Sequence, residues 1–145
     1  VRSRGLGDVY KRQVKVYYED TDAGGIVYYA NYLKYLERAR TEALSTIGLS
    51  NLQIKDKYGA LIIVKSCNIE YKNPSYLEDE LSIRSFIKSV TKTSFIMNQI
   101  ITKNENVVAE AKIHLVFINE KRKPIKVPEI IFNNFKPYFC ESIKS

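Results

Sequence analysis

The alternation of apolar and polar residues along the chain predicts one strand, one long helix and then a series of strands. Residues 14–19, VKVYYE, alternate and are rich in β-branched and aromatic side chains, which is typical of a strand. A turn cluster, DTDAGG, follows at 20–25. Residues 29–47 space their apolar side chains three and four apart, which predicts a helix with one buried face that ends near Gly48. The apolar positions are Tyr32, Leu33, Leu36, Ala39, Ala43, Leu44 and Ile47.

Four further segments of strand character follow the helix, at 60–72, 79–90, 93–102 and 106–118. The last of them alternates cleanly between apolar and polar side chains, as expected for a strand with one buried face. The link KNENV at 103–107 has the length of a hairpin loop, so we expect consecutive strands to be antiparallel. A short terminal helix is expected within 127–140, beginning near Pro128.

This order of elements favours a single α+β domain in which a curved antiparallel sheet packs on one long helix. The helix would be about 27 Å long, and its apolar face needs a surface to cover it. The chain has 145 residues, the usual size of one domain, which we place at residues 14–140. No apolar run approaches the roughly 18 residues of a membrane helix, and no secretory signal is visible. Cys67 and Cys140 are too few for a disulfide framework, so we expect a cytoplasmic protein.

Residues 1–13, VRSRGLGDVYKRQ, differ in character from the rest of the chain. They show no hydrophobic period and are rich in Arg and Gly. The run resembles translated adapter sequence that contaminates the ends of assembled genes, and the alternative is a natural, poorly ordered basic tail. It carries +3 of the net charge of +7. The modest remaining excess suits an anionic small ligand as well as RNA, and we leave these residues out of the functional argument.

The candidate chemistry lies at the junction between the first strand and the helix, DTDAGGIVYYANY at 20–32. Gly24 and Gly25 allow the backbone to approach a ligand closely. A helix start supplies unpaired N–H groups and the positive end of the helix dipole. Acyl transfer needs a carboxylate that attacks or deprotonates water, together with donors for the developing oxyanion. Asp and Gly before a helix also commonly form only a turn and a cap, so the residue types alone leave both interpretations open.

The pattern at this junction resembles the 4-hydroxybenzoyl-CoA thioesterase and YbgC-like branch of the hotdog superfamily. The matching string is Y-x-D-T-D-x-x-G-x-V-Y-x-x-N-Y, formed by Tyr18, Asp20, Thr21, Asp22, Gly25, Val27, Tyr28, Asn31 and Tyr32. The helix continues with E-x-A-R at Glu37, Ala39 and Arg40, and a second motif, I-x-Y-x-x-P-x-x-x-x-D, follows at Ile69, Tyr71, Pro74 and Asp79. The similarity covers roughly residues 14–130. It implies the hotdog fold, a curved antiparallel sheet wrapped around one long helix, and hydrolysis of an acyl-CoA thioester to a free carboxylic acid and CoA.

The resemblance also implies catalytic roles for two residues of the first motif. The second aspartate, Asp22, would act as nucleophile or general base, and the backbone N–H of Tyr29 would polarise the thioester carbonyl. Many YbgC-like proteins carry a histidine where this chain has Tyr29. A tyrosine, with an ordinary pKa of about 10, is not a base at neutral pH, which puts a histidine-assisted mechanism in doubt. A CoA thiolate leaves readily, because a thiol has an ordinary pKa of about 8.5.

The substrate contacts and partners are likewise expectations drawn from the resemblance. Gly25, Val27 and Tyr28 would contact the substrate, while Lys92 and Arg122 would hold the CoA phosphates. The basic residues of this region are equally explained as a solvated face: Lys88, Lys92, Lys121, Arg122, Lys123 and Lys126. We expect a homodimer or tetramer with sites at the subunit interface, and an acyl carrier protein as a candidate partner. No metal or prosthetic group is implied.

Several other polar residues are assigned structural roles. Asp20 is expected to shape the turn before the helix, and Glu37 and Arg40 to pair with each other or with the nearby backbone. His114, the only histidine, is expected to be solvated on the polar side of a strand. The two cysteines lack a histidine partner in the sequence and are interpreted as incidental thiols.

Three rival functions stay open at this point. The first is a non-catalytic hotdog scaffold that binds acyl-CoA or acyl carrier protein. The second is a hotdog dehydratase, which usually relies on a histidine that the motif here lacks. The third is RNA binding through the 11 tyrosines and the basic residues, although no RNA-binding motif is visible. The acyl chain preference does not follow from the sequence.

Overall fold

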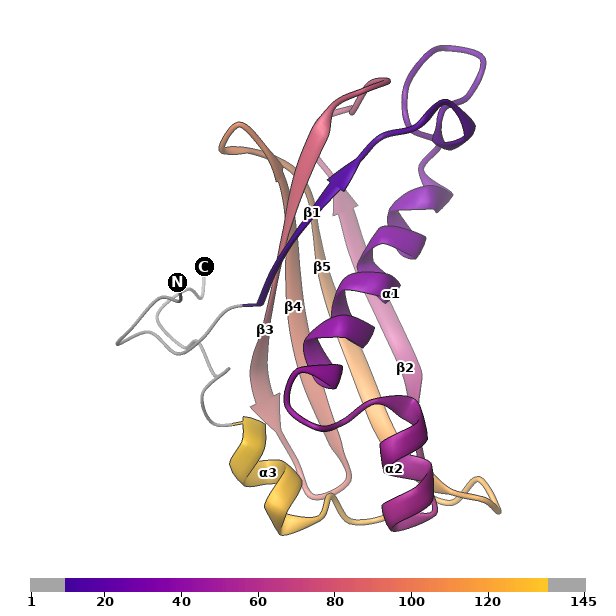
Figure 1. Cartoon of the computed structure of the whole chain (residues 1–145), viewed down its shortest axis with the longest axis vertical. Helices are drawn as coiled ribbons and strands as arrows, with labels where there is room; N and C mark the ends of the chain where they lie inside the picture. The colour runs from indigo at the N-terminus through magenta and orange to yellow at the C-terminus, as the bar shows by residue number, and fades with distance from the viewer. Residues whose placement is uncertain (1–9, 136–145) are drawn as a thin grey trace.

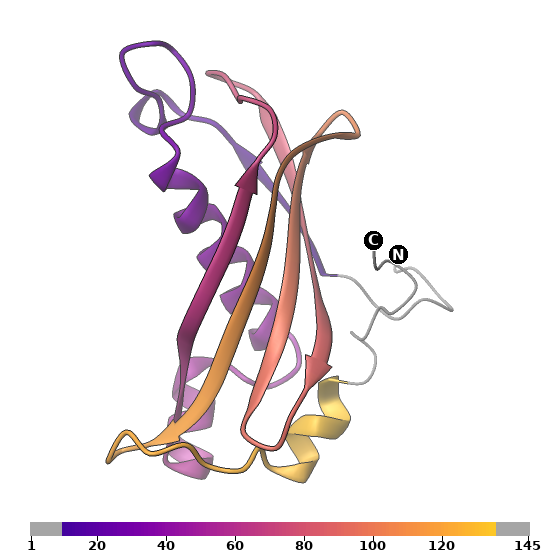
Figure 2. The same ribbon diagram turned by 180° about the vertical axis from the view of Figure 1, so that it is seen from behind.

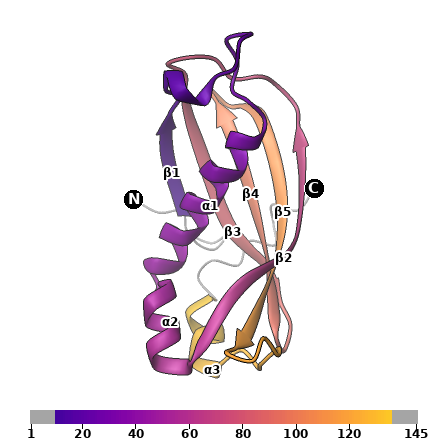
Figure 3. The ribbon, with the colours of Figure 1, turned by 90° about the vertical axis from the view of Figure 1, so that its right-hand side faces the viewer.

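A five-stranded antiparallel sheet in the order β1-β3-β4-β5-β2 curves around one long helix, α1 (Figure 1). The computed structural model describes residues 10–135. Its elements are β1 (Tyr10–Lys15), the 3₁₀ turn η1 (Tyr18–Asp20), α1 (Ala30–Ser45), α2 (Asn51–Tyr58), β2 (Ala60–Tyr71), β3 (Glu80–Val90), β4 (Ser94–Lys103), β5 (Asn106–Asn119) and α3 (Glu129–Phe135). Figure 3 shows α1 lying along one face of the sheet, and Figure 2 shows the strands from the opposite face. The predicted two-layer α+β architecture is confirmed.

The apolar face of α1 packs on the concave face of the sheet. Its buried side chains are Tyr32, Tyr35, Leu36, Ala39, Ala43 and Leu44. Side chains from β4 and β5, among them Phe95 and Ile113, are fully buried in the same core. Burial of each large side chain contributes about 1.5–3 kcal/mol to stability. The predicted stripe is confirmed except at Leu33, which is exposed, while Tyr35 takes a buried position that the spacing did not indicate.

One polar side chain, Gln99, lies completely buried between the helix and the sheet. Its Nε2 atom donates hydrogen bonds to the carbonyl oxygen of Leu36 (3.0 Å) and to Ser85 Oγ (2.9 Å). Its Oε1 atom accepts one from Arg40 Nη1 at 3.3 Å. A buried amide satisfied on both sides fixes α1 on the sheet, because loss of a partner leaves a polar group unpaired.

The predicted pair between Glu37 and Arg40 is wrong, because each side chain has a different hydrogen-bond partner. Arg40 turns toward Gln99 in the core, whereas Glu37 Oε2 accepts a hydrogen bond of 2.7 Å from Thr41 Oγ1 on the exposed side. Burial lowers the pKa of the Arg40 guanidinium, while Cys67 and Glu37 act in the opposite direction. The helix therefore uses Arg40 as a donor to the buried amide.

The first strand begins at Tyr10, four residues before the boundary that the sequence pattern placed at Val14. Residues 10–13 pair with β3 in register, from Tyr10 opposite Ser85 to Gln13 opposite Ser82. Tyr10 and Arg12 also reach α1, where the tyrosine hydroxyl donates to Glu42 Oε1 (2.9 Å) and Arg12 Nη1 pairs with Glu42 Oε2. Alternation failed here because both faces of this stretch carry polar side chains. Residues 1–9 lie outside the described part of the chain.

The other predicted elements agree closely with the structure, with two exceptions. The four later strands are confirmed to within one residue at each end, and a helix follows Pro128 as expected, although residues 136–140 of its predicted range are not described. The strand predicted through Glu19 is wrong, because the 3₁₀ turn η1 occupies that position. Helix α2 was missed, although Ser50 and Gln53 form a capping box, a recognisable start signal.

Strand β2 is an edge strand, since β5 is its one partner within residues 10–135. Most of its residues are exposed, including the apolar side chains of Leu61, Ile63 and Val64. A long exposed apolar edge offers unpaired backbone groups to another chain. Within the same described range, no helix is long and apolar enough to cross a membrane.

Candidate active site

A tight loop after η1 holds Asp22 by both its backbone and its side chain. The N–H of Asp22 donates to the carbonyl oxygen of Ile26 (2.9 Å), and the carbonyl of Asp22 accepts from the N–H of Gly25 (2.9 Å). Its Oδ1 atom accepts a hydrogen bond of 2.8 Å from the N–H of Gly24. Gly25 has a φ of +82°, a left-handed conformation that glycine adopts without steric cost. The predicted turn thus presents an exposed carboxylate in a defined position.

The carbonyl oxygen of Asp20 ties this loop to the start of α1. It accepts hydrogen bonds from the N–H of Tyr28 (3.0 Å) and from Asn31 Nδ2 (2.8 Å). The carboxylate of Asp20 accepts from the N–H of Tyr17 at 3.0 Å. Asp20 therefore shapes the turn and the approach to the helix, as predicted.

Tyr29 precedes the first residue of α1, and its side chain is 59% exposed. Among residues 10–135, no acceptor takes a hydrogen bond from the N–H of Tyr29. A free N–H at a helix start lies in the positive end of the helix dipole and can stabilise a developing oxyanion. The backbone group that the sequence singled out is therefore available for a ligand.

A cavity of about 260 Å³ opens beside the helix start. Its lining residues are Ile26, Val27, Tyr29, Tyr32, Tyr71, Lys72, Asn73 and Pro74. The ring of Tyr71 packs against Tyr29 edge-on at 6.0 Å and against Tyr32 at 5.7 Å between centroids. Burial, followed by the neighbouring Cys67, raises the pKa of Tyr71, so its hydroxyl stays neutral at ordinary pH. Asp22 does not itself line this cavity, although Ile26 and Val27 of the same loop do.

Five of the seven predicted site residues are brought together in this loop and helix start. Asp22, Gly25, Tyr28 and Tyr29 are exposed there, and Val27 is buried with its side chain toward the core. The sequence analysis missed the wall formed by Tyr71, Asn73 and Pro74. Its signal was the second motif, which contains Tyr71 and Pro74 but whose place beside the first motif depends on the fold.

Lys92 and Arg122 lie at the opposite end of the sheet from Asp22. Lys92 follows the end of β3 and Arg122 follows the end of β5, whereas the Asp22 loop contacts the segment before β3 through the bridge of Ile26 with Tyr76. Figure 1 shows the β1–α1 loop at the top of the molecule and the ends of β3 and β5 at the bottom. Strands of ten or more residues span about 33 Å or more. One protomer therefore does not bring these cations to Asp22.

Lys92 lines a separate cavity of about 410 Å³ at that far end. The other lining residues are Thr91, Lys126, Val127, Pro128, Glu129 and Phe132. The N–H of Val127 donates to the carbonyl of Lys92 at 2.7 Å and holds the two lysine-bearing segments side by side. Two cations beside a cavity of this size suit an anionic group.

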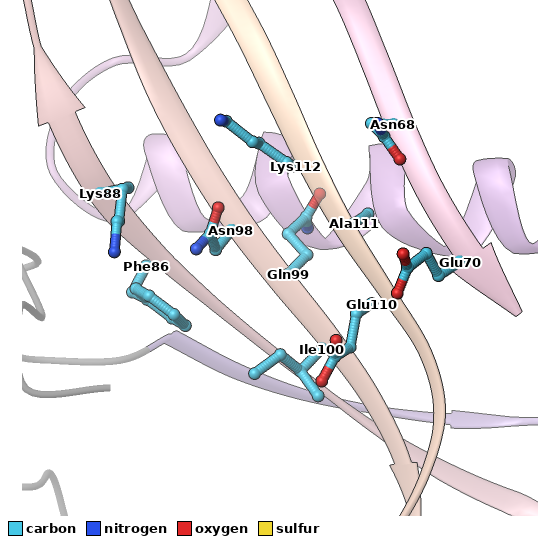
Figure 4. A pocket seen from close by; sticks show the side chains of 10 residues that line it. All are labelled: Asn68, Glu70, Phe86, Lys88, Asn98, Gln99, Ile100, Glu110, Ala111 and Lys112. Atoms are coloured by element: carbon cyan, nitrogen blue, oxygen red, sulfur yellow. The ribbon is translucent and has the colours of Figure 1, made fainter. Parts of the chain in front are cut away.

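A third hollow, of about 290 Å³, lies on the outer face of the sheet (Figure 4). Charged and amide side chains from four strands surround it, including Lys88, Asn98, Glu110 and Lys112. Lys72 pairs with Glu110 at 3.8 Å and with Glu70 at 3.5 Å beside this hollow. The hollow contains none of the seven predicted site residues.

The histidine and the cysteines, the other candidate reactive residues, have no contacts that indicate catalysis within residues 10–135. His114 is half-buried, and its Nε2 atom lies 3.0 Å from Ser94 Oγ, so the expectation of a solvated histidine is wrong. Cys67 is a free, exposed thiol on β2, and Cys140 lies outside the described residues. Within residues 10–135, no group of three or more His, Cys, Asp or Glu residues is placed to hold a metal ion.

Comparisons with known proteins identify the family. The model of the thioesterase-like superfamily matches residues 16–135. The acyl-CoA thioester hydrolase YbgC of Escherichia coli O6:H1 is 38% identical over 130 residues, which cover 88% of this chain and 96% of that protein.

Solved structures share the architecture over most of the chain. A probable thioesterase from Bartonella henselae superposes with a TM-score of 0.78 at 31% identity, over 83% of this chain and 99% of that one. A 4-hydroxybenzoyl-CoA thioesterase superposes with a TM-score of 0.83 at 23% identity, over 88% and 99% of the two chains. This confirms the hotdog fold. The protein accordingly belongs to the thioesterase-like superfamily, as a member of its YbgC-like and 4-hydroxybenzoyl-CoA thioesterase branch.

Proposed function

We propose that this protein hydrolyses an acyl-CoA thioester to a free carboxylic acid and CoA, with Asp22 as the catalytic carboxylate. The observation that carries the proposal is an exposed carboxylate, that of Asp22, on the short loop that leads to a free helix-start N–H, that of Tyr29. The carbonyl of Asp20 ties this loop to the helix start through Tyr28 and Asn31. The YbgC relative is named as an acyl-CoA thioester hydrolase, which supports the same reaction.

In this mechanism Asp22 acts as nucleophile or general base. Its Oδ1 atom is engaged by Gly24, while Oδ2 accepts no hydrogen bond among residues 10–135 and is free to meet a carbonyl carbon or a water molecule. As the tetrahedral intermediate forms, the Tyr29 N–H donates to its oxyanion. The C–S bond then breaks, and CoA leaves as a thiolate because its conjugate thiol is acidic enough, at a pKa of about 8.5. With Asp22 as general base, water has attacked and the acid is released directly; with Asp22 as nucleophile, water then hydrolyses the acyl-aspartyl anhydride to the free acid and restores the carboxylate.

The substrate would lie against Gly25, Val27 and Tyr28, with its acyl group directed into the tyrosine-lined cavity. Lys92 and Arg122 would hold the CoA phosphates. Because these cations lie at the far end of their own protomer, a second copy must supply them. A homodimer that pairs the exposed β2 edges antiparallel would do so, since it sets the far end of one sheet beside the Asp22 end of the other.

A non-catalytic scaffold that binds acyl-CoA or acyl carrier protein is the alternative. The free Oδ2 atom of Asp22 supports the enzyme, because hydrolysis needs a carboxylate oxygen that is not already engaged. The thioester-hydrolase name of the relative favours it as well.

The test is release of thiol from a panel of short-chain, long-chain and aromatic acyl-CoAs, followed with a thiol-reactive dye. We expect turnover of at least one class, and a loss of about 10²-fold or more in kcat for Asp22→Asn. Asp56→Asn, on the exposed side of α2, is the matched control and should be fully active. Absence of thiol release from every acyl-CoA, or full activity of Asp22→Asn, would refute the proposal.

A further inference from the structure

The second sequence motif, from Ile69 to Asp79, includes the loop between β2 and β3. This loop contacts the loop that carries Asp22, here called the catalytic loop (residues 21–28). The N–H of Val27 donates to the carbonyl oxygen of Ser75 at 2.8 Å. Ile26 forms an isolated antiparallel bridge with Tyr76. These contacts join two segments that are about 50 residues apart in the sequence. The β2–β3 loop is therefore the surface on which the catalytic loop rests.

Ser75 also holds the first turn of α1 through its side chain. The hydroxyl of Tyr32 donates to Ser75 Oγ at 3.0 Å. Ser75 is completely buried and Tyr32 is 4% exposed, so their hydrogen bond lies in a place with little exposure to bulk water. One residue thus contacts the catalytic loop with its carbonyl and the helix with its hydroxyl.

The β2–β3 loop is itself anchored on both sides. Asp79 Oδ2 accepts the N–H of Tyr76 at 2.8 Å and lies 2.9 Å from Lys103 Nζ, whose ammonium group sits 5.4 Å from the centroid of the Tyr76 ring. Val16 of the segment after β1 exchanges two backbone hydrogen bonds with Glu78 and Asp79, at 3.0 and 2.9 Å. Ser75 is consequently held in place, and its hydrogen bonds restrict the motion of Val27 and Tyr32.

We propose that Ser75 is a positioning residue, whose hydrogen bond with Tyr32 fixes the first turn of α1, and with it the N–H of Tyr29, relative to Asp22. The inference rests on the proposed function of that site. The proposal assigns a role to the second motif. Asp79 restricts the motion of the β2–β3 loop, and Ser75 in that loop aligns the Tyr29 N–H with the Asp22 carboxylate.

The physical reason is the cost of an unpaired buried hydroxyl. Without Ser75 Oγ, the hydroxyl of Tyr32 has lost its acceptor in a buried place, and the ring must shift to find another. Tyr32 lines the cavity, and its N–H donates to the carbonyl of Tyr29 at 3.2 Å. A shift of Tyr32 therefore moves the peptide groups at Tyr29, where small displacements of a donor cost much of its effect on the rate.

The test compares Ser75→Ala, Tyr32→Phe and the double variant with Ser82→Ala. Ser82 is the matched control, because its Oγ is buried without a hydrogen-bond partner among residues 10–135. We expect Ser75→Ala to lower kcat about tenfold and to change KM less, by about twofold, because the loss falls mainly on the alignment of the oxyanion donor. The double variant should be no slower than the worse single one, since both remove the same hydrogen bond.

A second measurement does not depend on turnover. Amide hydrogen exchange of residues 22–32 should be about tenfold faster in Ser75→Ala than in wild type and unchanged in Ser82→Ala. The proposal is overturned if kcat of Ser75→Ala stays within about twofold of the Ser82→Ala value, or if exchange in the loop is unchanged. Wild-type protein that turns over no acyl-CoA would refute the proposed function alone, and the exchange result would still decide whether Ser75 positions the loop.

Discussion

The backbone N–H of Gly24 donates a hydrogen bond of 2.8 Å to Oδ1 of Asp22, so the carboxylate is held by its own loop. A Cβ atom at Gly24 would lie 3.3 Å from that oxygen, which is close enough to displace it by a few tenths of an ångström. We expect Gly24→Ala to lower kcat about tenfold, because displacement of Oδ1 moves the whole carboxylate, including the reactive Oδ2, while the fold is kept. Steady-state kinetics with any acyl-CoA that is turned over provides the measurement.

Gly25→Ala is the informative counterpart. Its Cβ would meet nothing within 4 Å, but the residue has a φ of +82°. We therefore expect a loss of about 1–2 kcal/mol in the free energy of unfolding, measured with urea, and a smaller effect on kcat than at Gly24. Equal kcat for wild type and Gly24→Ala would mean that the Gly24 hydrogen bond does not set the position of the carboxylate.

The second prediction concerns the side chain of Tyr29. If its backbone N–H is the group that acts, the phenol hydroxyl is dispensable, and Tyr29→Phe should keep kcat within about threefold of wild type. The ring contacts with Tyr28 and Tyr71 survive this change. A loss of about 10²-fold would assign chemistry to the hydroxyl and contradict the backbone-donor mechanism.

Local patterns were sufficient to predict the long helix and the four later strands. Helix α1 and strands β3, β4 and β5 each bury one face, which leaves a period in the sequence. Strand β2 is mostly exposed and was predicted from its run of apolar residues instead. The same reasoning failed where burial follows from a distant partner. Residues 10–13 show no hydrophobic period, which excluded them from the predicted first strand, yet they form the start of β1, where Tyr10 and Arg12 pair with Glu42 of α1.

The residues of the candidate site likewise fall into two groups, those that are close in sequence and those that only the fold brings together. The carboxylate and the helix start are neighbours in the sequence, so the motif located them. Ser75 and Tyr71 join the site only because β2 crosses to the far edge of the sheet beside β5, and the loop after it returns to the β1–α1 loop. No local pattern encodes that return. The distance of Lys92 from Asp22 likewise follows from strand direction and length.

The third prediction tests whether residues 10–13 belong to the domain. A chain that begins at Val14 lacks four residues of β1 and the contacts of Tyr10 and Arg12 with Glu42. Lost cross-strand pairs and hydrogen bonds of this kind cost about 2 kcal/mol in total. Compared with a chain that begins at Tyr10, we expect the thermal midpoint to fall by about 6–10 °C. Identical midpoints in a melting experiment would show that these four residues are dispensable.

The fourth prediction concerns stability at high pH. Burial, with the nearby carboxylate of Asp20 adding to it, raises the pKa of Tyr35 well above its ordinary value. An unfolded tyrosine loses its proton near pH 10, while the folded protein keeps it, so the folded state binds more protons above that pH. Stability is therefore complete below about pH 10 and falls as the pH rises, by up to about 1.4 kcal/mol per pH unit for this group.

Urea unfolding between pH 8 and 11.5, about the range in which tyrosine ionises, measures this dependence. Tyr35→Phe removes the titrating group and should decline less steeply than wild type. Tyr17→Phe, whose ring is 60% exposed, should follow the wild-type curve. Parallel curves for Tyr35→Phe and wild type would contradict the assignment to this buried hydroxyl.

The last prediction addresses the separation of Asp22 from Lys92 and Arg122 within one protomer. If the site is shared, the double variant Lys92→Ala/Arg122→Ala should raise KM about tenfold or more, because charge-assisted contacts with the CoA phosphates are lost. Asp22→Asn should instead lower kcat. Each homodimer is defective for a different reason, which makes a mixed dimer informative.

In a mixed dimer built from these two variants, the shared arrangement creates one intact site. The Asp22→Asn protomer contributes its lysine and arginine, and the other protomer contributes Asp22. We expect such a dimer, isolated through two different affinity tags, to recover wild-type KM and about half of the wild-type kcat per dimer. Sites contained within single protomers predict no recovery, because one site lacks the carboxylate and the other lacks its cations. Raised KM in the mixed dimer would thus contradict an interface site, whereas recovery has no explanation in a protomer that acts alone.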